Sequence, residues 1–257
     1  MFSLKPYGIV IALAMLAGYL VGFWRRKKYQ LEASDLENLF LLTVPLGIIG
    51  ARLYHVLDKW EYYSQHLSQI PAVWNGGLGV YGAVGGGIVG LIVYKKISNF
   101  NPPAGGQISN LLDFLMPSLA IGQAIGRWGN FFNHEAFGGP TNLPWKWFIP
   151  PNFRPEYWKN YSYFHPTFGY ESLWVLVGFT LLIFIEKHLA TREPNTGLLT
   201  GFYAFWYGLG RFFFEFLRFD TAEVGGIKVA QIISLLLIAV GLWLVRKRVS
   251  PTGKSLM

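Results

Sequence analysis

The chain has 257 residues, of which 52% are hydrophobic and 14% are charged, and its formal net charge is +8. Soluble domains carry about 25% charged residues, so this composition excludes an ordinary soluble domain and indicates a polytopic membrane protein. The absence of cysteine excludes disulfides, thiolate metal sites and a nucleophilic cysteine in the protein itself. The lysines and arginines lie in short clusters between apolar segments, a pattern that orients membrane proteins and argues against a nucleic-acid partner.

Apolar segments of close to the ~20 residues that cross a bilayer recur along the chain and predict an all-α fold of about seven transmembrane helices. They are Tyr7–Trp24, Leu36–Leu57, Leu78–Tyr94, Ile108–Ile125, Tyr170–Ile185, Leu198–Phe216 and Val229–Val245. No basic segment precedes the first one, and a basic run follows it, which favours a true span over a signal peptide. We interpret residues 1–257 as a single integral membrane domain.

The distribution of lysine and arginine predicts the topology. Loops that alternation places inside carry Arg25, Arg26, Lys27, Lys28, Lys95, Lys96, Lys187, Arg192, Arg246, Lys247, Arg248 and Lys254. The short outer loops carry few, with Lys59 after the second span and Lys228 before the last. The positive-inside rule therefore predicts that the N-terminus lies outside and the C-terminus inside, and a re-entrant segment would change the count by one.

One connection, residues 131–166, is long and rich in proline and aromatic residues. Its prolines exclude a regular helix through the segment. Tryptophan and tyrosine at this density are typical of the headgroup level of a bilayer. We therefore expect an irregular cap that lies on the outer leaflet.

Small residues recur every four residues in the third apolar segment, at Gly82, Gly86 and Gly90 and again at Gly79, Ala83 and Gly87. The segment 77–82 also matches the dinucleotide fingerprint G-x-G-x-x-G, but it opens a membrane span and lacks the acidic residue that the fingerprint requires further on. Small residues at this spacing instead form a ridge on which another helix packs closely. A substrate groove beside that ridge is compatible with the same pattern.

A dense run of polar side chains, Arg127, Asn130, Asn133 and Glu135, directly follows the apolar stretch Leu111–Ile125. A charge at the centre of a membrane helix costs about 2.5–3.5 kcal/mol on insertion scales, so it usually meets a polar substrate, an ion or an internal partner. The alternative is an arginine at a helix end that reaches lipid phosphates. The density of polar residues favours a functional site.

The predicted topology places polar side chains from several spans at one level near the outer leaflet: Tyr7, Tyr81, Arg127, His165, Glu171, Arg211, Glu215 and Arg218. Arg211 and Glu215 are four residues apart and share a helix face, so Glu215 fits a structural ion pair as well as a catalytic role. Two arginines on separate spans would repel each other unless they share an anion, and guanidinium groups bind phosphate in a bidentate manner. The phosphate of a phospholipid headgroup is the obvious anion.

Several motifs follow one another between Tyr7 and Arg218: Tyr7-Gly8, Gly50-Ala51-Arg52, Trp74-Asn75-Gly76-Gly77, Gly126–Glu135 with Gly138, His165–Glu171 and Tyr207–Arg218. In residues and order they resemble the bacterial prolipoprotein diacylglyceryl transferases. The resemblance implies a multi-pass enzyme of the bacterial cytoplasmic (inner) membrane, with its active site toward the outer leaflet. Such an enzyme moves a diacylglyceryl group from phosphatidylglycerol to the lipobox cysteine in the signal peptide of a prolipoprotein, and glycerol phosphate leaves.

The same resemblance implies roles for individual residues. Arg127 would bind the lipid phosphate, Asn130 and Gly138 would shape that pocket, and Asn133 and Glu135 belong to the same substrate-binding motif. Arg211 would be the second essential arginine, and Tyr7, Glu171 and Glu215 match positions that are important in the family. Some members have a histidine, proposed as a general base, where this chain has Tyr81. Because a phenol is a poor base at neutral pH, the base stays open among Tyr7, Tyr81, Glu171 and Glu215.

The chemistry fits a chain without cysteine, because the attacking thiol belongs to the substrate. Nearby arginines favour the thiolate and stabilise a phosphate leaving group. We expect neither a metal nor a cofactor, since the histidines are scattered without ligand spacing. The alternatives are a transporter or channel for an anionic or lipid substrate, which would show internal repeats and sites at the midplane, and a scaffold whose charges pair internally.

Overall fold

The computed structural model describes residues 6–97, 108–188, 197–219, 221 and 223–249, without the side chains of Asn75, Ile108, Val224, Arg248 and Val249. Arg192 and Lys254, on which the topology prediction partly rests, lie outside the described residues. The described chain is mainly helical and carries two short antiparallel hairpins. It divides into two compact units: a smaller unit, Arg26–Gly106, and a larger unit, Met1–Arg25 with Gln107–Met257.

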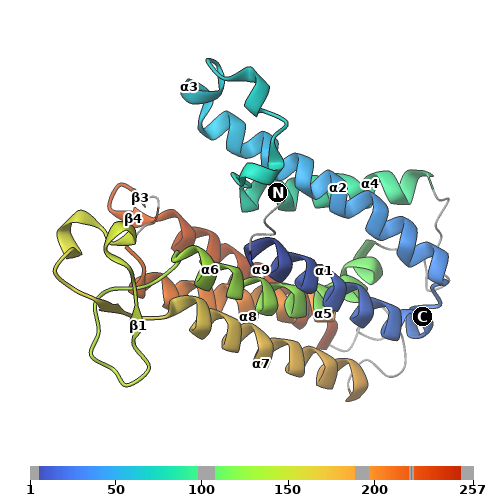
Figure 1. Cartoon of the computed structure of the whole chain (residues 1–257). Helices are drawn as coiled ribbons and strands as arrows, with labels where there is room; N and C mark the ends of the chain where they lie inside the picture. The colour runs from blue at the N-terminus through green and yellow to red at the C-terminus, as the bar shows by residue number, and fades with distance from the viewer. Residues whose placement is uncertain (1–5, 98–107, 189–196, 220, 222, 250–257) are drawn as a thin grey trace, which may run out of the picture. The chain divides into compact units, whose positions relative to one another are not determined.

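The smaller unit is built on two long helices that lie side by side (Figure 1). Short helical turns precede and connect them. The elements are η1 (Arg26–Tyr29), α2 (Ala33–Asp58), α3 (Trp60–Tyr63), η2 (Leu67–Gln69), η3 (Val73–Asn75) and α4 (Val80–Ile97).

Glycines let the main chains of α2 and α4 approach each other closely. A β-carbon at Gly82 or Gly86 would collide with main-chain carbonyl groups of α2. One at Gly90 would lie 2.8 Å from the Cα of Thr43. A β-carbon at Gly87 would meet no atom within 4 Å. The predicted ridge is therefore confirmed for Gly82, Gly86 and Gly90, which serve helix packing inside the smaller unit, whereas the second predicted row is wrong at Gly87, which faces open space.

Arg52, a buried side chain of α2, organises the segment that joins α3 to α4. Its guanidinium donates hydrogen bonds to the main-chain oxygens of Gln69 (2.6 Å), Ile70 (2.8 Å), Gly76 (2.6 Å) and Gly77 (3.1 Å). These bonds satisfy carbonyl groups that would otherwise lack partners in an irregular segment. Arg52 thus holds this loop in place.

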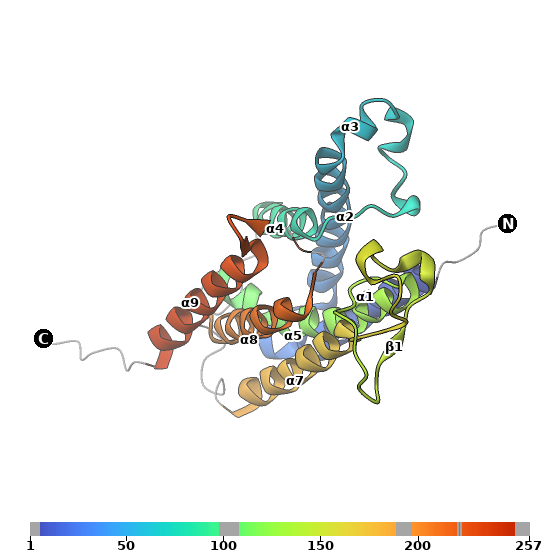
Figure 2. The same cartoon turned by 90° about the vertical axis from the view of Figure 1, so that its left-hand side faces the viewer.

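The larger unit is a helical bundle in which α1 packs on α5 and α6, α5 on α7 and α8, and α8 on both α7 and α9 (Figure 2). Its helical elements are α1 (Pro6–Arg25), α5 (Ile108–Gly126), α6 (Trp128–Asn133), α7 (Thr167–His188), α8 (Leu198–Phe214), η6 (Glu215–Leu217) and α9 (Val229–Val249). A hairpin of β3 (Glu223–Val224) and β4 (Ile227–Lys228) joins η6 to α9.

The predicted cap is irregular, as its prolines require. Helix α6 extends to Asn133, three residues into the range 131–166, and no α-helix follows before α7. The cap contains a hairpin of β1 (Trp147–Phe148) and β2 (Tyr163–Phe164), with η4 (Pro151–Phe153) and η5 (Glu156–Trp158) between the strands. Phe137, Ile149 and Phe164 form its buried core.

Within the part of the chain that the structure describes, five helical stretches are long and apolar enough to cross a membrane: Pro6–Tyr29, Ala33–Asp58, Val80–Ile97, Thr167–His188 and Val229–Lys247. Many of their apolar side chains are exposed on the surface of the protein. Apolar surface of this extent is typical of contact with lipid and is unfavourable in water. The fold is therefore consistent with an all-α membrane protein. Helices α5 and α8 occupy the fourth and sixth predicted spans. The approximate end predicted for the sixth, Phe216, lies in the 3₁₀ turn η6, which directly follows the end of α8 at Phe214.

Buried polar contacts tie the larger unit together at the end of α5 that is remote from Arg127. Arg25 of α1 donates two hydrogen bonds of 2.7 Å to the carboxylate of Glu186 on α7. Asp113 of α5 accepts hydrogen bonds from the main-chain nitrogen (2.8 Å) and the hydroxyl (2.6 Å) of Thr200 on α8. Because each charged group is paired or hydrogen-bonded, its burial is tolerated.

Two neighbouring glycines of α4 offer a matched test of the close α2–α4 packing. We expect Gly86→Ala to destabilise the protein, because its methyl group has no space, and overpacking costs about 1–3 kcal/mol. Gly87→Ala should be neutral or stabilising, since alanine favours a helix over glycine by up to about 1 kcal/mol. Thermal unfolding of the detergent-solubilised variants measures both, and equal melting temperatures would contradict the packing role.

Candidate functional site

Charged residues from distant parts of the sequence converge on one carboxylate in the larger unit. Oε2 of Glu171 on α7 lies 2.6 Å from Nη2 of Arg127. Its Oε1 lies 3.6 Å from Nη1 of Arg211 and 3.7 Å from Nη1 of Arg218. Oε2 of Glu215 lies 2.7 Å from Nη2 of Arg211. We call these five residues the arginine cluster.

The arginine cluster is poorly exposed and has an excess of positive charge. The side chains of Glu171 and Glu215 are 5% and 0% exposed, and those of the arginines between 13% and 20%. Three guanidinium groups and two carboxylates give a formal charge of +1. Among the described residues, Glu171 Oε1, Arg211 Nη1 and both carboxylate oxygens of Glu215 have no hydrogen-bond partner. A site with spare cationic charge and unsatisfied polar atoms favours the binding of an anion.

Arg127 lies at a break between two helices that a serine stabilises. Helix α5 ends at Gly126 and α6 begins at Trp128, so the helical hydrogen-bond ladder is interrupted here. The Ser172 hydroxyl donates a 2.7 Å hydrogen bond to the Ala124 carbonyl and accepts a 3.2 Å one from Nε1 of Trp128. Ser172 directly follows Glu171, so the same turn of α7 fixes the break and provides the partner of Arg127.

Two tryptophans hold α7 and α8 in register. Nε1 of Trp174 donates to the Trp206 carbonyl, and Nε1 of Trp206 donates to the Trp174 carbonyl, both at 2.9 Å. Their rings stack with centroids 4.2 Å apart. Each ring lies against a glycine of the opposite helix, Gly178 or Gly210, where a β-carbon would collide with it. Trp174 is three residues from Glu171, and Gly210 precedes Arg211. The contact between the two tryptophans, the tryptophan clasp, therefore sets the positions of Glu171 and Arg211 relative to each other.

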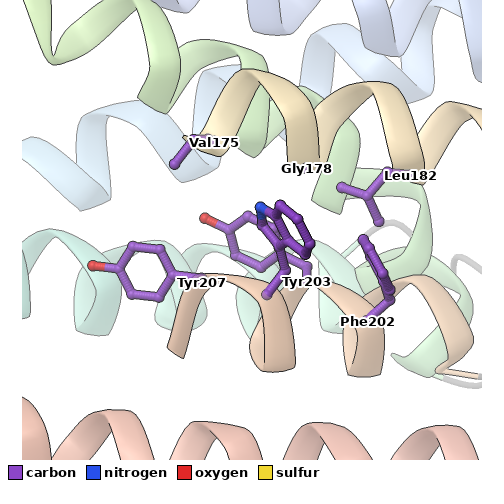
Figure 3. A pocket seen from close by; sticks show the side chains of 7 residues that line it. Val175, Gly178, Leu182, Phe202, Tyr203 and Tyr207 are labelled. Atoms are coloured by element: carbon purple, nitrogen blue, oxygen red, sulfur yellow. The ribbon is translucent and has the colours of Figure 1, made fainter. Parts of the chain in front are cut away.

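Aromatic side chains of α8 line a crevice between α8 and α7. Phe202 and Tyr203 project from α8 toward α7, and Tyr207 extends along α8 (Figure 3). They line a narrow apolar crevice with Val175, Gly178, Leu182 and Trp206. The Tyr203 hydroxyl donates a 2.8 Å hydrogen bond to Oε1 of Gln123, one helical turn before Arg127 on α5. This bond ties α8 to α5 next to the cluster.

Lys228 fixes the turn that follows α8. Its ammonium donates hydrogen bonds to the main-chain oxygens of Glu215 (2.8 Å) and Arg218 (2.5 Å). These carbonyl groups lie at the end of a helix, where a cation interacts favourably with the helix dipole. Lys228 therefore holds in place the segment that carries Arg218.

The other predicted residues of the polar run lie in α6 or directly after it. Asn130 and Asn133 each donate a 3.1 Å hydrogen bond to Oε1 of Glu135. The Tyr7 ring lies against Gly129, where a β-carbon would be 2.8 Å from two ring atoms.

Gly138 is confined by neighbours on two sides. Its amide donates a 2.9 Å hydrogen bond to the His165 carbonyl. A β-carbon at Gly138 would be only 2.8 Å from the Leu217 carbonyl oxygen, next to Arg218. Any larger residue would therefore push against the turn that carries Arg218.

Of the residues predicted from the sequence, the structure joins Arg127, Glu171, Arg211 and Glu215 in one cluster. Tyr81 belongs to the smaller unit, where its ring lies 5.7 Å from that of Tyr54, and its role stays a prediction. No role in the site was predicted for Arg218, which was only placed at the same level, or for Ser172 and Lys228. The sequence carried a signal only for Arg218, three residues after Glu215; the hydrogen bonds of Ser172 and Lys228 depend on tertiary contacts.

The fold and the site define a helical membrane protein with a buried cluster of arginines suited to an anionic substrate. A family model described as prolipoprotein diacylglyceryl transferase matches residues 1–246. The chain therefore belongs to the prolipoprotein diacylglyceryl transferase family.

Relatives named phosphatidylglycerol–prolipoprotein diacylglyceryl transferase align over nearly the whole chain. The protein of Thermosynechococcus vestitus is 40% identical over 94% of this chain and 87% of its own length. Fervidobacterium nodosum has one that is 38% identical, over 98% of this chain and 84% of its own. The protein of Staphylococcus haemolyticus is 40% identical over 93% of this chain and 82% of its own length.

The hydrogen bonds of Ser172 predict a stability effect. We expect Ser172→Ala to lower the free energy of unfolding by about 1–3 kcal/mol, because it leaves a buried carbonyl and an indole N–H without partners. Thr180→Ala is the control on the same helix, since Thr180 is exposed and bonds only within its own turn. Thermal unfolding compares the two variants. A Ser172 variant as stable as the control would show that the hydroxyl does not support the break at Arg127.

Proposed function

We propose that this chain transfers the diacylglyceryl group of phosphatidylglycerol to the lipobox cysteine of prolipoproteins, the first step of bacterial lipoprotein maturation. The observation that carries the proposal is the arginine cluster, in which guanidinium groups from two separate helical segments meet at one buried carboxylate. The names of the relatives state the same two substrates.

Arg127 and Arg211 bind the phosphate of the lipid in this proposal. They come from different helices and share Glu171 as counter-ion, so a phosphodiester that replaces this carboxylate meets two forks of hydrogen-bond donors. Asn130, Asn133, Glu135 and Gly138 shape the adjoining pocket. Their mutual hydrogen bonds and tight packing support a fixed geometry on this side of the cluster.

The reaction is a displacement at carbon. The thiolate sulfur of the lipobox cysteine attacks the terminal glycerol carbon of the diacylglyceryl group, a C–S bond forms, and the bond from that carbon to the phosphate oxygen breaks. Glycerol phosphate leaves with the electron pair, and a base takes the thiol proton. Because negative charge grows on the leaving phosphate, the arginines stabilise the transition state more than the bound substrate.

The proton acceptor is one of four residues in this proposal: Tyr7, Tyr81, Glu171 or Glu215. Guanidinium groups near the thiol lower its pKa from the ordinary value of about 8.5, so the demand on a base is small. Positioning of the thiol and the lipid carbon in a site that excludes water supplies a further part of the rate.

We further propose that residues 1–257 form one membrane domain of seven spans in the bacterial inner membrane, with the N-terminus outside and the site at the outer leaflet. Helices α5 and α8 are the fourth and sixth spans. Their ends that carry Arg127 and Arg211 are those assigned to the outer side by the distribution of lysine and arginine. The aromatic cap lies on the outer leaflet beside the phosphates.

The direct test incubates the purified, folded protein with phosphatidylglycerol and a synthetic lipobox peptide, and detects the product by mass spectrometry. The proposal expects a peptide that is heavier by one diacylglyceryl group in thioether linkage, together with glycerol phosphate. A folded protein that yields no thioether would refute the proposed reaction, and an anion transporter would be the next candidate.

Loss of either phosphate-binding arginine should abolish most activity. We expect Arg127→Ala and Arg211→Ala to lower kcat/KM about 10²–10³-fold, as does removal of a donor that stabilises transition-state charge. Lys159→Ala removes an exposed cation of the cap and should leave the activity unchanged. Size-exclusion profiles show whether the variants are folded. Arginine variants that are folded and fully active would contradict the assignment, whereas loss of the protein itself would indicate a purely structural ion pair.

A further inference from the structure

We infer that Glu171 recognises the hydroxyl groups of the glycerol headgroup and so selects phosphatidylglycerol among phosphodiester lipids. The inference rests on the proposed function and adds a role that differs from holding the arginines. The carboxylate of Glu171, which pairs with arginines in the substrate-free protein, is the hydrogen-bond acceptor for the headgroup hydroxyls.

One oxygen of Glu171 is incompletely satisfied in the structure. Its Oε2 pairs closely with Arg127 at 2.6 Å, whereas its Oε1 is 3.6 Å and 3.7 Å from guanidinium nitrogens of Arg211 and Arg218. Those distances exceed a normal hydrogen bond. Oε1 is buried and has no hydrogen-bond partner among the described residues. It is therefore an acceptor that is available to a ligand.

Binding of the lipid phosphate leaves the Glu171 carboxylate with still fewer hydrogen-bond donors. The phosphate competes with Glu171 for the same guanidinium groups, and each group that turns to the phosphate takes a partner from the carboxylate. A buried carboxylate without donors is strongly unfavourable, so it needs a replacement. In phosphatidylglycerol the headgroup hydroxyls are only a few bonds from the phosphorus, close enough to donate to Glu171 while the phosphate contacts the arginines.

Glu215 is less suited to this role. Both of its oxygens also lack a hydrogen-bond partner among the described residues, but its side chain is fully buried, at 0% exposed, and its Oε2 lies 2.7 Å from Nη2 of Arg211 within one turn of the same segment. The exposed parts of the cluster belong to the arginines around Glu171, with Arg127 at 20%. A ligand that arrives at these arginines meets Glu171 first, so Glu215 serves as a fixed counter-ion of Arg211.

The experiment compares two lipids with identical acyl chains, phosphatidylglycerol and phosphatidylpropanol, in the peptide assay. The reacting carbon and the phosphodiester are the same in both, and only the headgroup hydroxyls differ. A hydrogen bond to a charged group corresponds to about a ten- to hundredfold preference, so we expect wild-type kcat/KM to favour phosphatidylglycerol by at least about tenfold.

Glu171→Gln, which keeps the size of the side chain, and Glu171→Ala, which removes both oxygens, should lower this preference. We expect the ratio to fall several-fold in the glutamine variant and to near unity in the alanine variant. Glu215→Gln is the matched control: it should weaken both substrates alike and keep the wild-type ratio. For variants without measurable turnover, retention of the two lipids in native mass spectrometry gives the ratio.

Two results would overturn the inference while the proposed reaction stands: a wild-type enzyme that uses both lipids equally, or Glu171 variants that keep the wild-type ratio at lower activity. The second would assign Glu171 to proton transfer or to arginine positioning alone. A folded wild-type protein that makes no thioether from phosphatidylglycerol would instead refute the proposed function itself, so the two failures are distinguishable.

Discussion

The carboxylate of Glu171 neutralises guanidinium groups that reach it from the α5–α6 break and from the end of α8. In surroundings with little water, arginines this close would repel one another strongly without an anion between them. Several contacts of the larger unit hold the segments that meet at this one carboxylate. The Ser172 bonds, the tryptophan clasp and the Lys228 contact each fix one of the segments that meet there.

The arginine cluster and the Arg25–Glu186 pair lie toward opposite ends of α7 and differ in completeness. Arg25 forms two hydrogen bonds with its carboxylate at 2.7 Å, the geometry of a permanent structural pair. In the arginine cluster, only some guanidinium groups are close to a carboxylate oxygen, and several polar atoms have no hydrogen-bond partner among the described residues. This contrast explains how one helix contains both a structural ion pair and a site where an incoming phosphate can compete.

The sequence allowed the class of protein, the helix positions and four of the five cluster residues to be predicted. Hydrophobic length locates spans because lipid penalises any polar interruption, and Arg211 and Glu215 share a helix face through their spacing alone. The glycine ridge was predictable for a similar reason, since a four-residue repeat is a local property. The 3₁₀ turn after α8 was not predicted, and the hydrogen bond that Lys228 donates to it is a tertiary contact with no local sequence signal.

By itself, then, the sequence determined which segments are helical and apolar, where charges interrupt them, and, through motifs in register, the family. Only the tertiary structure decided that Glu171 is the common partner of Arg127, Arg211 and Arg218, and that Ser172 supports the break beside it. The physical reason is that a local pattern fixes the face and depth of a side chain on its own helix. Which faces of different helices meet depends on packing among segments that are far apart in the chain.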